Sequence, residues 1–282
     1  MATTLTWIGS VSGDVNVAGN WSPAQVPIGG DSIIMNDKAQ AAMTASLGTF
    51  AAMKFGSFHV GNSCNFAVGT GAADGSGLKF AAAKLVHQGT AAFYYEAVAL
   101  GVNKTDLIIV NSSNRELAMN VNATAAAQID TFNGTAGNIV FTGSGITMSS
   151  LIISYRSSIN SDTIMSSTGT FDLSPTIFMK GGFVTTQFLA GETFCMGGKL
   201  VIEYNSSTPV IGTGFYIGGN AEVVYKGDSV VPLIELRSGT LDLTQRSHEA
   251  TVTILRRWPG TILKTNDLVT ITNTEDMTGG DI

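Results

Sequence analysis

Gly197-Gly-Lys-Leu-Val-Ile-Glu-Tyr204 and Gly218-Gly-Asn-Ala-Glu-Val-Val-Tyr225 each place two glycines before a short run of β-forming residues. Glycine supplies the positive φ angles of a tight corner, and the run that follows has the composition of a strand. The same unit recurs from about residue 100 onward and predicts an all-β chain. Its other runs are 106–110, 138–141, 151–155, 170–173, 182–185, 240–243, 251–255 and 268–271.

The runs start at irregular intervals of roughly twelve to two dozen residues, so a strict short repeat is absent. A parallel β-helix tolerates this because only its strands stack, while its loops vary. The alternative is a β-sandwich or jelly roll, whose short strands recur about every 8–12 residues. Short strands, glycine pairs at the corners, little alternation to a charged face and no helical pattern favour a single-chain parallel β-helix, or β-solenoid.

The first hundred residues follow the pattern less clearly. Two alanine-rich stretches, 39–54 and 81–100, have helical composition. Segments with strand-like spacing between glycines lie in and around them, at 57–60, 65–68, 77–80, 84–87 and 92–95. We therefore expect early turns of the solenoid here, with alanines inside, and leave open a short helix within 38–54.

Composition limits the function. Charged residues form 13% of the chain, about half the usual share, while hydrophobic residues form 44%, enough for a sizeable core. The net charge is −6, and the fifteen basic residues are dispersed; Arg256-Arg257 is the nearest approach to a basic patch. Because phosphate contacts need clustered lysine and arginine, we expect no nucleic-acid binding.

The N-terminus has neither the basic region nor the apolar region of a secretory signal, and no segment approaches the ~20 apolar residues of a membrane span. We expect assembly in a cytoplasm and no membrane partner.

Cys64 and Cys195 have no second Cys or His at metal spacing, so we expect core thiols, no metal and no cofactor, with a single disulfide left open.

The most specific local pattern lies at the N-terminus. Trp7 and Gly9 are followed by Asn20-Trp21 and then by Pro27-Ile-Gly-Gly-Asp31, directly before the run 32–35. Two indoles offer large apolar plates, and an aspartate after a Pro-Gly turn can accept hydrogen bonds from the turn amides. A solenoid must cover its open end, so we predict a cap over 1–36 and a β-helical body over 37–282.

This WxG…NW…VPxxGD pattern resembles the opening of two groups of β-helical proteins: autotransporter-type adhesins, where similar segments recur, and tailed-phage virion proteins, where the motif occurs once. The run 84–89, Phe93-Tyr-Tyr95 and the run 106–111 are also similar to the phage group. The motif covers about residues 7–35, occurs once in this chain and has no export signal before it. Both features favour the phage setting.

The resemblance implies a capsid decoration, or cement, protein on the virion surface, with the major capsid protein as partner and a homotrimer as the oligomeric state. The residues it carries over are Trp7, Gly9, Asn20, Trp21, Pro27 and Asp31, as cap or attachment candidates; no catalytic residue comes with them. The alternatives are a carbohydrate-binding fibre or adhesin and, less favoured, a glycan-cleaving tailspike.

Glycan cleavage would need two converging carboxylates, and the candidate pairs are Glu203 with Glu222 and Glu235 with Asp242. We interpret these acids as solvating residues beside lysines and arginines, and expect no enzymatic activity.

His59, His87 and His248 are dispersed, and the glycine-rich stretch 69–77 lacks the ending of a phosphate loop. The aromatics at 93–95 and 215–216 could stack on sugars, but neighbours in a strand point to opposite faces, which favours a core role.

Overall fold

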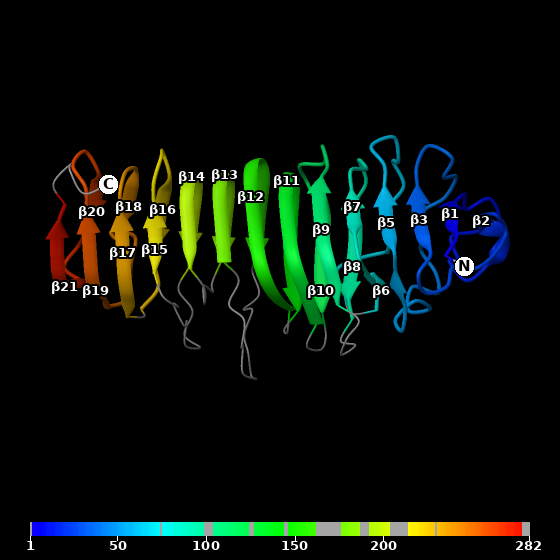
Figure 1. The fold of residues 1–282 in the computed structure, drawn as a ribbon, viewed down its shortest axis with the longest axis horizontal. Coiled ribbons are helices and arrows are strands. Elements are labelled where there is room, and N and C mark those ends of the chain that lie inside the picture. Colours follow the sequence, from blue (N-terminus) through cyan, green and yellow to red (C-terminus); the bar gives the residue numbers. More distant parts are fainter. Residues whose placement is uncertain are drawn as a thin grey trace. The chain divides into compact units, whose positions relative to one another are not determined.

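The computed structural model describes residues 2–73, 75–98, 104–123, 127–143, 146–161, 176–186, 192–203, 214–228 and 230–277 (Figure 1). The chain divides into two compact units, Met1–Met148 and Ser149–Ile282. In both units short strands pair in parallel with strands of the preceding and following turns. The chain is a parallel β-helix, as its strand pattern predicted.

The predicted run 65–68 forms only an isolated bridge at Val68, whereas the other predicted runs overlap strands of the first unit. These strands are β1 (Thr4–Trp7), β2 (Trp21–Ser22), β3 (Ser32–Met35), β4 (Lys54–Phe55), β5 (Ser57–Val60), β6 (Leu78–Ala82), β7 (Leu85–His87), β8 (Phe93–Ala97), β9 (Thr105–Asn111), β10 (Met119–Ala123) and β11 (Ala127–Gly143).

The second unit continues with strands that are long at first and short later. They are β12 (Ile146–Ser161), which spans the boundary between the units, β13 (Thr176–Thr186), β14 (Thr193–Ile202), β15 (Phe215–Ile217), β16 (Glu222–Tyr225), β17 (Val231–Leu236), β18 (Thr240–Asp242), β19 (Ala250–Arg257), β20 (Ile262–Lys264) and β21 (Val269–Asp276). The run 170–173 and Tyr204 lie outside the described residues.

Each turn of the first unit contributes strands to two parallel stacks. One stack contains β1, β3, β5, β7, β9 and the first half of β11. The other contains β4, β6, β8, β10 and the second half of β11. Sandwiches and jelly rolls pair their strands antiparallel, whereas in the described part of the chain only β1 and β2 do so.

This two-stack arrangement explains the irregular spacing of the runs, because consecutive runs in the sequence belong to different stacks. Partners within one stack are 28 residues apart at Leu5 and Ile33 but only 16 apart at Phe178 and Phe194. The difference lies in the loops, which do not take part in the pairing.

The second unit also has two parallel stacks, and β13 and β14 each run through both of them. The first half of β14 pairs with β15, which leads to β17, β19 and β21, and the second half pairs with β16, which leads to β18 and β20. Gly182 and Gly198 separate the halves, with φ of +81° and +78°. A Cβ at Gly198 would collide with the carbonyl of Gly182 one turn earlier, so the predicted glycine corners are confirmed.

The core consists of side chains that lie above one another in successive turns. Leu5, Ile33, Phe58, Leu85 and Ile108 occupy one register position of the first stack, and all are fully buried. Because successive strand residues point to opposite faces, this register brings every second residue inside. Burial of each such side chain contributes roughly 1.5–3 kcal/mol.

The alanine-rich stretches do not form helices. Residues 39–53 form turns and isolated parallel bridges, such as Met43 with Val68, so the short helix that the sequence allowed within 38–54 is wrong. The described part of 81–98 contributes to β6, β7 and β8, as expected. Helical structure among the described residues is one 3-10 turn, Ala18–Asn20. Stacking against neighbouring turns overrides the weak helical preference of alanine.

One titratable side chain lies in the apolar core. His87 occupies the same register position as Val60 and Val110, is 1% exposed and packs 5.6 Å from the Phe93 ring. Neither ring nitrogen has a hydrogen-bond partner among the described residues. Burial lowers the pKa of His87 to about 4, and the nearby backbone of Ala118 and Ala91 offsets only part of this effect. The folded chain therefore holds His87 neutral.

We predict an acid-dependent loss of stability from His87. The folded pKa lies below the unfolded one, so its contribution is complete above about pH 6.5 and declines as pH falls toward 4. The loss for this residue is about 3 kcal/mol. Urea unfolding at pH 7 and pH 4 should show a smaller pH effect for His87→Leu than for the wild type. Equal pH effects in the two proteins would contradict the assignment.

Candidate functional site

The six motif residues converge at the beginning of the first unit. Trp7 ends β1 and pairs with Trp21 of β2 in antiparallel register, while β1 also pairs in parallel with β3. Asn20 closes the 3-10 turn before β2, and Asp31 directly precedes β3. β1 is thus paired with β3 on one side and, at Thr6 and Trp7, with β2 on the other.

The two indoles form the centre of this cap. The rings of Trp7 and Trp21 meet edge to face at 4.9 Å, with an interplanar angle of 72°, and Phe50 lies 6.4 Å from Trp21. Each indole N–H donates to a backbone carbonyl, from Trp7 to Ala41 at 2.8 Å and from Trp21 to Val15 at 2.9 Å. Both side chains are buried, so they cover the first turn of the core. Their hydrogen bonds also hold the segments that contain Ala41 and Val15.

Asn20 organises the loop between β1 and β2. Its Oδ1 accepts hydrogen bonds from the backbone N–H groups of Val11 and Ser12, at 2.9 and 3.0 Å. Its Nδ2 donates to the Ser12 hydroxyl and to the carbonyl of Asp14. The buried amide thus uses two acceptor and two donor positions, which a shorter or apolar side chain would leave unpaired.

Asp31 plays the same part in the Pro27–Asp31 turn. Its carboxylate accepts the backbone N–H of Thr3 at 2.8 Å and that of Ile28 at 2.9 Å, and the side chain is fully buried. Pro27 is buried beside it. Gly9 has φ +65°, and a Cβ there would come within 3.1 Å of both Ala41 and the Trp7 ring. The motif residues thus pack against and hydrogen-bond to the loops around β1, β2 and β3.

The motif side chains face inward, so they cannot contact a partner directly. Their role in attachment stays a prediction, in which they would act by fixing the shape of the cap. The exposed apolar residues of this region are Val11, 67% exposed, and Ile28, 58% exposed. The sequence analysis did not single out either residue. The available signal was their position in otherwise polar or glycine-rich turns, where an apolar side chain has no strand face to cover.

The first pair of candidate acids does not converge. Glu222 lies opposite Lys199 and binds it at 3.0 Å, while Glu203, four residues beyond Lys199, binds Lys226 at 2.8 Å. Four residues of strand separate the two acids by about 13 Å along the strand direction. This exceeds the carboxylate spacing of roughly 5–9.5 Å in glycoside hydrolases.

The second pair lies on different stacks. Glu235 belongs to β17 and Asp242 to β18; Asp242 accepts hydrogen bonds from Thr244 and lies 3.8 Å from Lys264. Each acid lies next to a cation of its own stack, Glu235 beside Arg256 and Asp242 beside Lys264. The two acids lie beside cations, as expected, but they are 7% and 4% exposed, so the interpretation of this pair as solvating residues is wrong.

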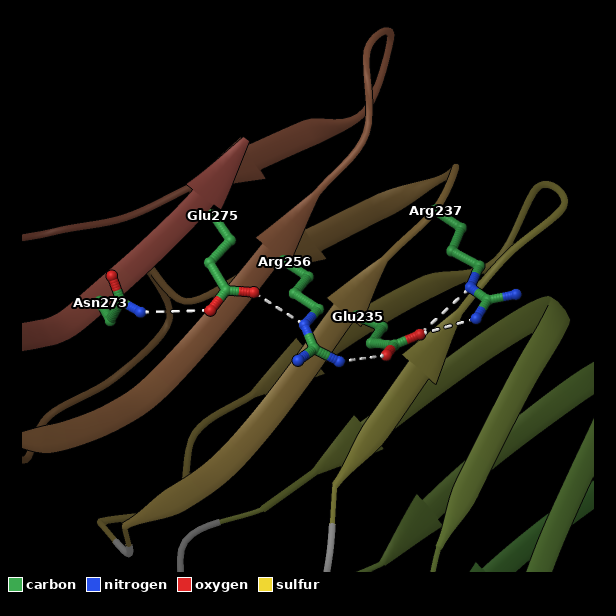
Figure 2. Close-up of polar contacts among 5 residues, drawn as sticks. All are labelled: Glu235, Arg237, Arg256, Asn273 and Glu275. Carbon is green, nitrogen blue, oxygen red and sulfur yellow. Dashed lines mark hydrogen bonds and ion pairs between the residues drawn. The ribbon is translucent and has the colours of Figure 1, made fainter. Parts of the chain in front are cut away.

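Figure 2 shows the ion pairs around Glu235, on the outer face of β17, β19 and β21. Arg256 donates to Glu235 at 3.0 Å and to Glu275 at 2.8 Å, and Arg237 donates to Glu235 from the other side at 2.8 Å. Asn273 completes the group by donating to Glu275. The two carboxylates raise the pKa of Arg256 through their hydrogen bonds, Glu275 more than Glu235.

The same register position is aromatic in the preceding turns. Phe178, Phe194 and Tyr216 align with Glu235, and their rings stack at 5.1 and 4.7 Å with interplanar angles of 8° and 10°. We call these three residues the aromatic column. As expected, Phe215 points inward and Tyr216 outward, but the alignment with Phe178 and Phe194 could not be predicted without the register.

The histidines and cysteines stay apart. His59 contacts Gln88 at 3.1 Å, His248 contacts Ser247 at 2.9 Å, and His87 lies in the core. Cys64 and Cys195 are buried free thiols, so the disulfide left open does not form. Burial raises the pKa of Cys195 to about 12, which keeps it protonated and unreactive at neutral pH.

The glycine-rich stretch 69–77 lies against β8. A Cβ at Gly77 would come within 3.1 Å of the Glu96 backbone nitrogen, so the close contact requires glycine. Gly75, Gly77, Gly48, Lys79 and Glu96 line a shallow pocket of about 230 Å³. Its one buried charge, Glu96, binds Lys79 at 2.5 Å and accepts the N–H of Gly75. The pocket is thus internally satisfied.

No group of three or more His, Cys, Asp or Glu among the described residues is arranged to hold a metal ion. The same residues include no helix with the length and apolar character needed to cross a membrane. The chain matches no family model, no curated protein and no solved structure.

The cap makes a direct prediction about Asp31. Asp31→Ala leaves the buried N–H groups of Thr3 and Ile28 without acceptors, which should lower the free energy of unfolding by about 2–4 kcal/mol. Asp31→Asn keeps one acceptor oxygen and should lose about half as much. Amide hydrogen exchange over residues 2–35 reports the effect locally.

Asp37→Ala is the matched control, because Asp37 lies just after β3, as Asp31 lies just before it, but is exposed. It should leave the exchange of residues 2–35 within about 0.5 kcal/mol of the wild type. If Asp31→Ala and Asp37→Ala had the same effect, Asp31 would not hold the cap together.

Proposed function

We propose that this chain is a non-enzymatic structural protein of a tailed-phage virion, which decorates the capsid surface and stabilises it by bridging subunits of the major capsid protein. The proposal includes assembly in the host cytoplasm and a homotrimeric state. The phage setting and the trimer depend on the resemblance of the motif from Trp7 to Asp31. The mechanical role depends on the fold and its outer faces.

The observation that supports the proposal most directly is that the candidate acids form ion pairs. Glu203, Glu222 and Glu235 each form an ion pair with a lysine or arginine of a neighbouring turn. Paired carboxylates of this kind hold turns in register, whereas a hydrolase needs one free base and one protonated acid converging on a bond. A stack with a sealed end and cross-turn ion pairs suits a role in which the protein resists force.

The cap supplies the surface that we assign to the capsid. Its motif residues are buried and leave Val11 and Ile28 as exposed apolar contacts at the first turns. Apolar side chains in the centre of an interface contribute most of its binding energy. Attachment at this end leaves the outer faces of the later turns available for other contacts.

The alternative function is a carbohydrate-binding fibre or adhesin, and one observation favours it. The aromatic column lies on the outer face of the second unit, where aromatic rings could contact a glycan. Binding on a glycan array, with no binding to capsids, would establish this alternative in place of the capsid role.

The capsid role is tested by adding the purified chain to capsids of the encoding phage from which it has been removed. Cosedimentation should show saturable binding, and cryo-electron microscopy should show density at regular positions on the coat lattice. Val11→Glu should weaken binding roughly tenfold or more, because it places a charge in an apolar contact.

Val230→Glu is the matched control, since Val230 is also an exposed valine, 58% exposed, but belongs to the second unit. It should bind as the wild type does. Density at the tail tip alone, or a coat lattice without the protein, would overturn the proposal.

A further inference from the structure

The aromatic column is part of an exposed apolar face in the second unit. Phe178 is 40% exposed, Phe194 and Tyr216 are half-buried, and Met196, two residues after Phe194, is 53% exposed. Outward-facing positions of a β-helix in water are normally polar, as they are in the later turns at Glu235, Arg256 and Glu275 (Figure 2). Two phenylalanines and a methionine at such positions indicate a contact surface.

The ring geometry favours a protein partner over a sugar. The three rings are within 10° of parallel and stack on one another, so each covers a face of its neighbour. A sugar ring stacks on an open aromatic face and also needs polar side chains that are free to bind its hydroxyls. Phenylalanine has no polar group, and Glu235, which aligns with Tyr216 in the next turn, already binds two arginines. Aromatic residues and methionine are instead the residues enriched in protein interfaces.

The charges beside the aromatic column indicate which protein fits. Glu192 precedes Phe194 by two residues, Lys180 follows Phe178 by two, and both are exposed. The two charges therefore lie on opposite sides of the column along the strand direction. The group continuing the column contains two acids, Glu235 and Glu275, and two bases, Arg237 and Arg256, so it carries no net charge. This face is complementary to itself.

We propose that the aromatic column, with Met196, Lys180 and Glu192, is the surface through which copies of this chain associate side by side. A rotation axis parallel to the stacking direction of the second unit keeps equivalent turns level. It turns the Lys180 side of one copy toward the Glu192 side of the next while the apolar residues meet. The proposed function includes a homotrimer, and this inference names the surface through which its subunits would meet. Association of the purified chain can be measured without any capsid.

The first test compares two phenylalanines of the same strand. Phe178→Ser removes a ring of the column, and Phe183→Ser removes one of similar exposure, 43%, from the half of β13 that belongs to the other stack. Light scattering and sedimentation equilibrium of the full chain should show an oligomer. Phe178→Ser should weaken it roughly 30-fold, and Phe183→Ser should leave it unchanged.

The second test reverses the charges, which distinguishes a specific contact from general loss of solubility. Lys180→Glu and Glu192→Lys should each weaken association by bringing like charges together, and the double variant should restore it. A monomer at all concentrations, equal effects of Phe178→Ser and Phe183→Ser, or failure of the double variant to recover would overturn the proposal.

Two results separate this inference from its alternatives. A monomer that binds glycans and loses them on Phe178→Ser would identify the column as a sugar site. An oligomer that behaves as described but does not bind capsids would leave the self-association standing and contradict the capsid role.

Discussion

Parallel pairing in register determines which side chains each strand position of this molecule can accept. When each strand pairs with the strand one turn away, every residue lies about 4.8 Å from its equivalent in the next turn. A side chain must therefore be compatible with its partners above and below it. Leu5, Ile33 and Phe58 satisfy this inside the stack by excluding water, and Glu235, Arg256 and Glu275 satisfy it outside by alternating charge. The same constraint explains why His87 is held neutral between two valines.

The constraint also makes the ends of the stack special, because an end turn lacks a neighbour on one side. At the first turn the missing neighbour is replaced in part by the antiparallel strand β2 and the indoles of Trp7 and Trp21. The buried side chains of Asn20 and Asp31 bind the backbone N–H groups of the adjoining loops. β2 pairs with two residues of β1 and so covers part of the edge to which another sheet could add strands. Contacts with other molecules must then use side chains on the outside of the turns, which is where Val11, Ile28 and the aromatic column are exposed.

Much of the fold follows from local sequence, since glycine corners and short β-forming runs need no long-range information. The register does not, because loops of different length separate the partners: Phe178 pairs 16 residues ahead and Leu5 pairs 28 ahead. The aromatic column and the ion pairs of Glu235 could therefore not be predicted as groups. The helix allowed within 38–54 was wrong for a related reason, since bridges to other turns decide that segment. The motif could be recognised because its residues lie close in sequence, and the bond from Ile28 to Asp31 stays within the predicted turn; the contacts with Thr3 and Ala41, more distant in the chain, could not be predicted.

The register is tested most directly by cross-linking in the second unit. Lys199 and Glu222 are paired across one turn, and Glu222 pairs in turn with Thr240. With Lys199→Cys and Glu222→Cys together, mild oxidation should give a disulfide in nearly all molecules, because a spacing of about 4.8 Å lies within the range that a disulfide accepts. With Lys199→Cys and Thr240→Cys, two turns and about 9.6 Å apart, none should form. Cross-linking of the second pair in place of the first would contradict the parallel register on which the whole account depends.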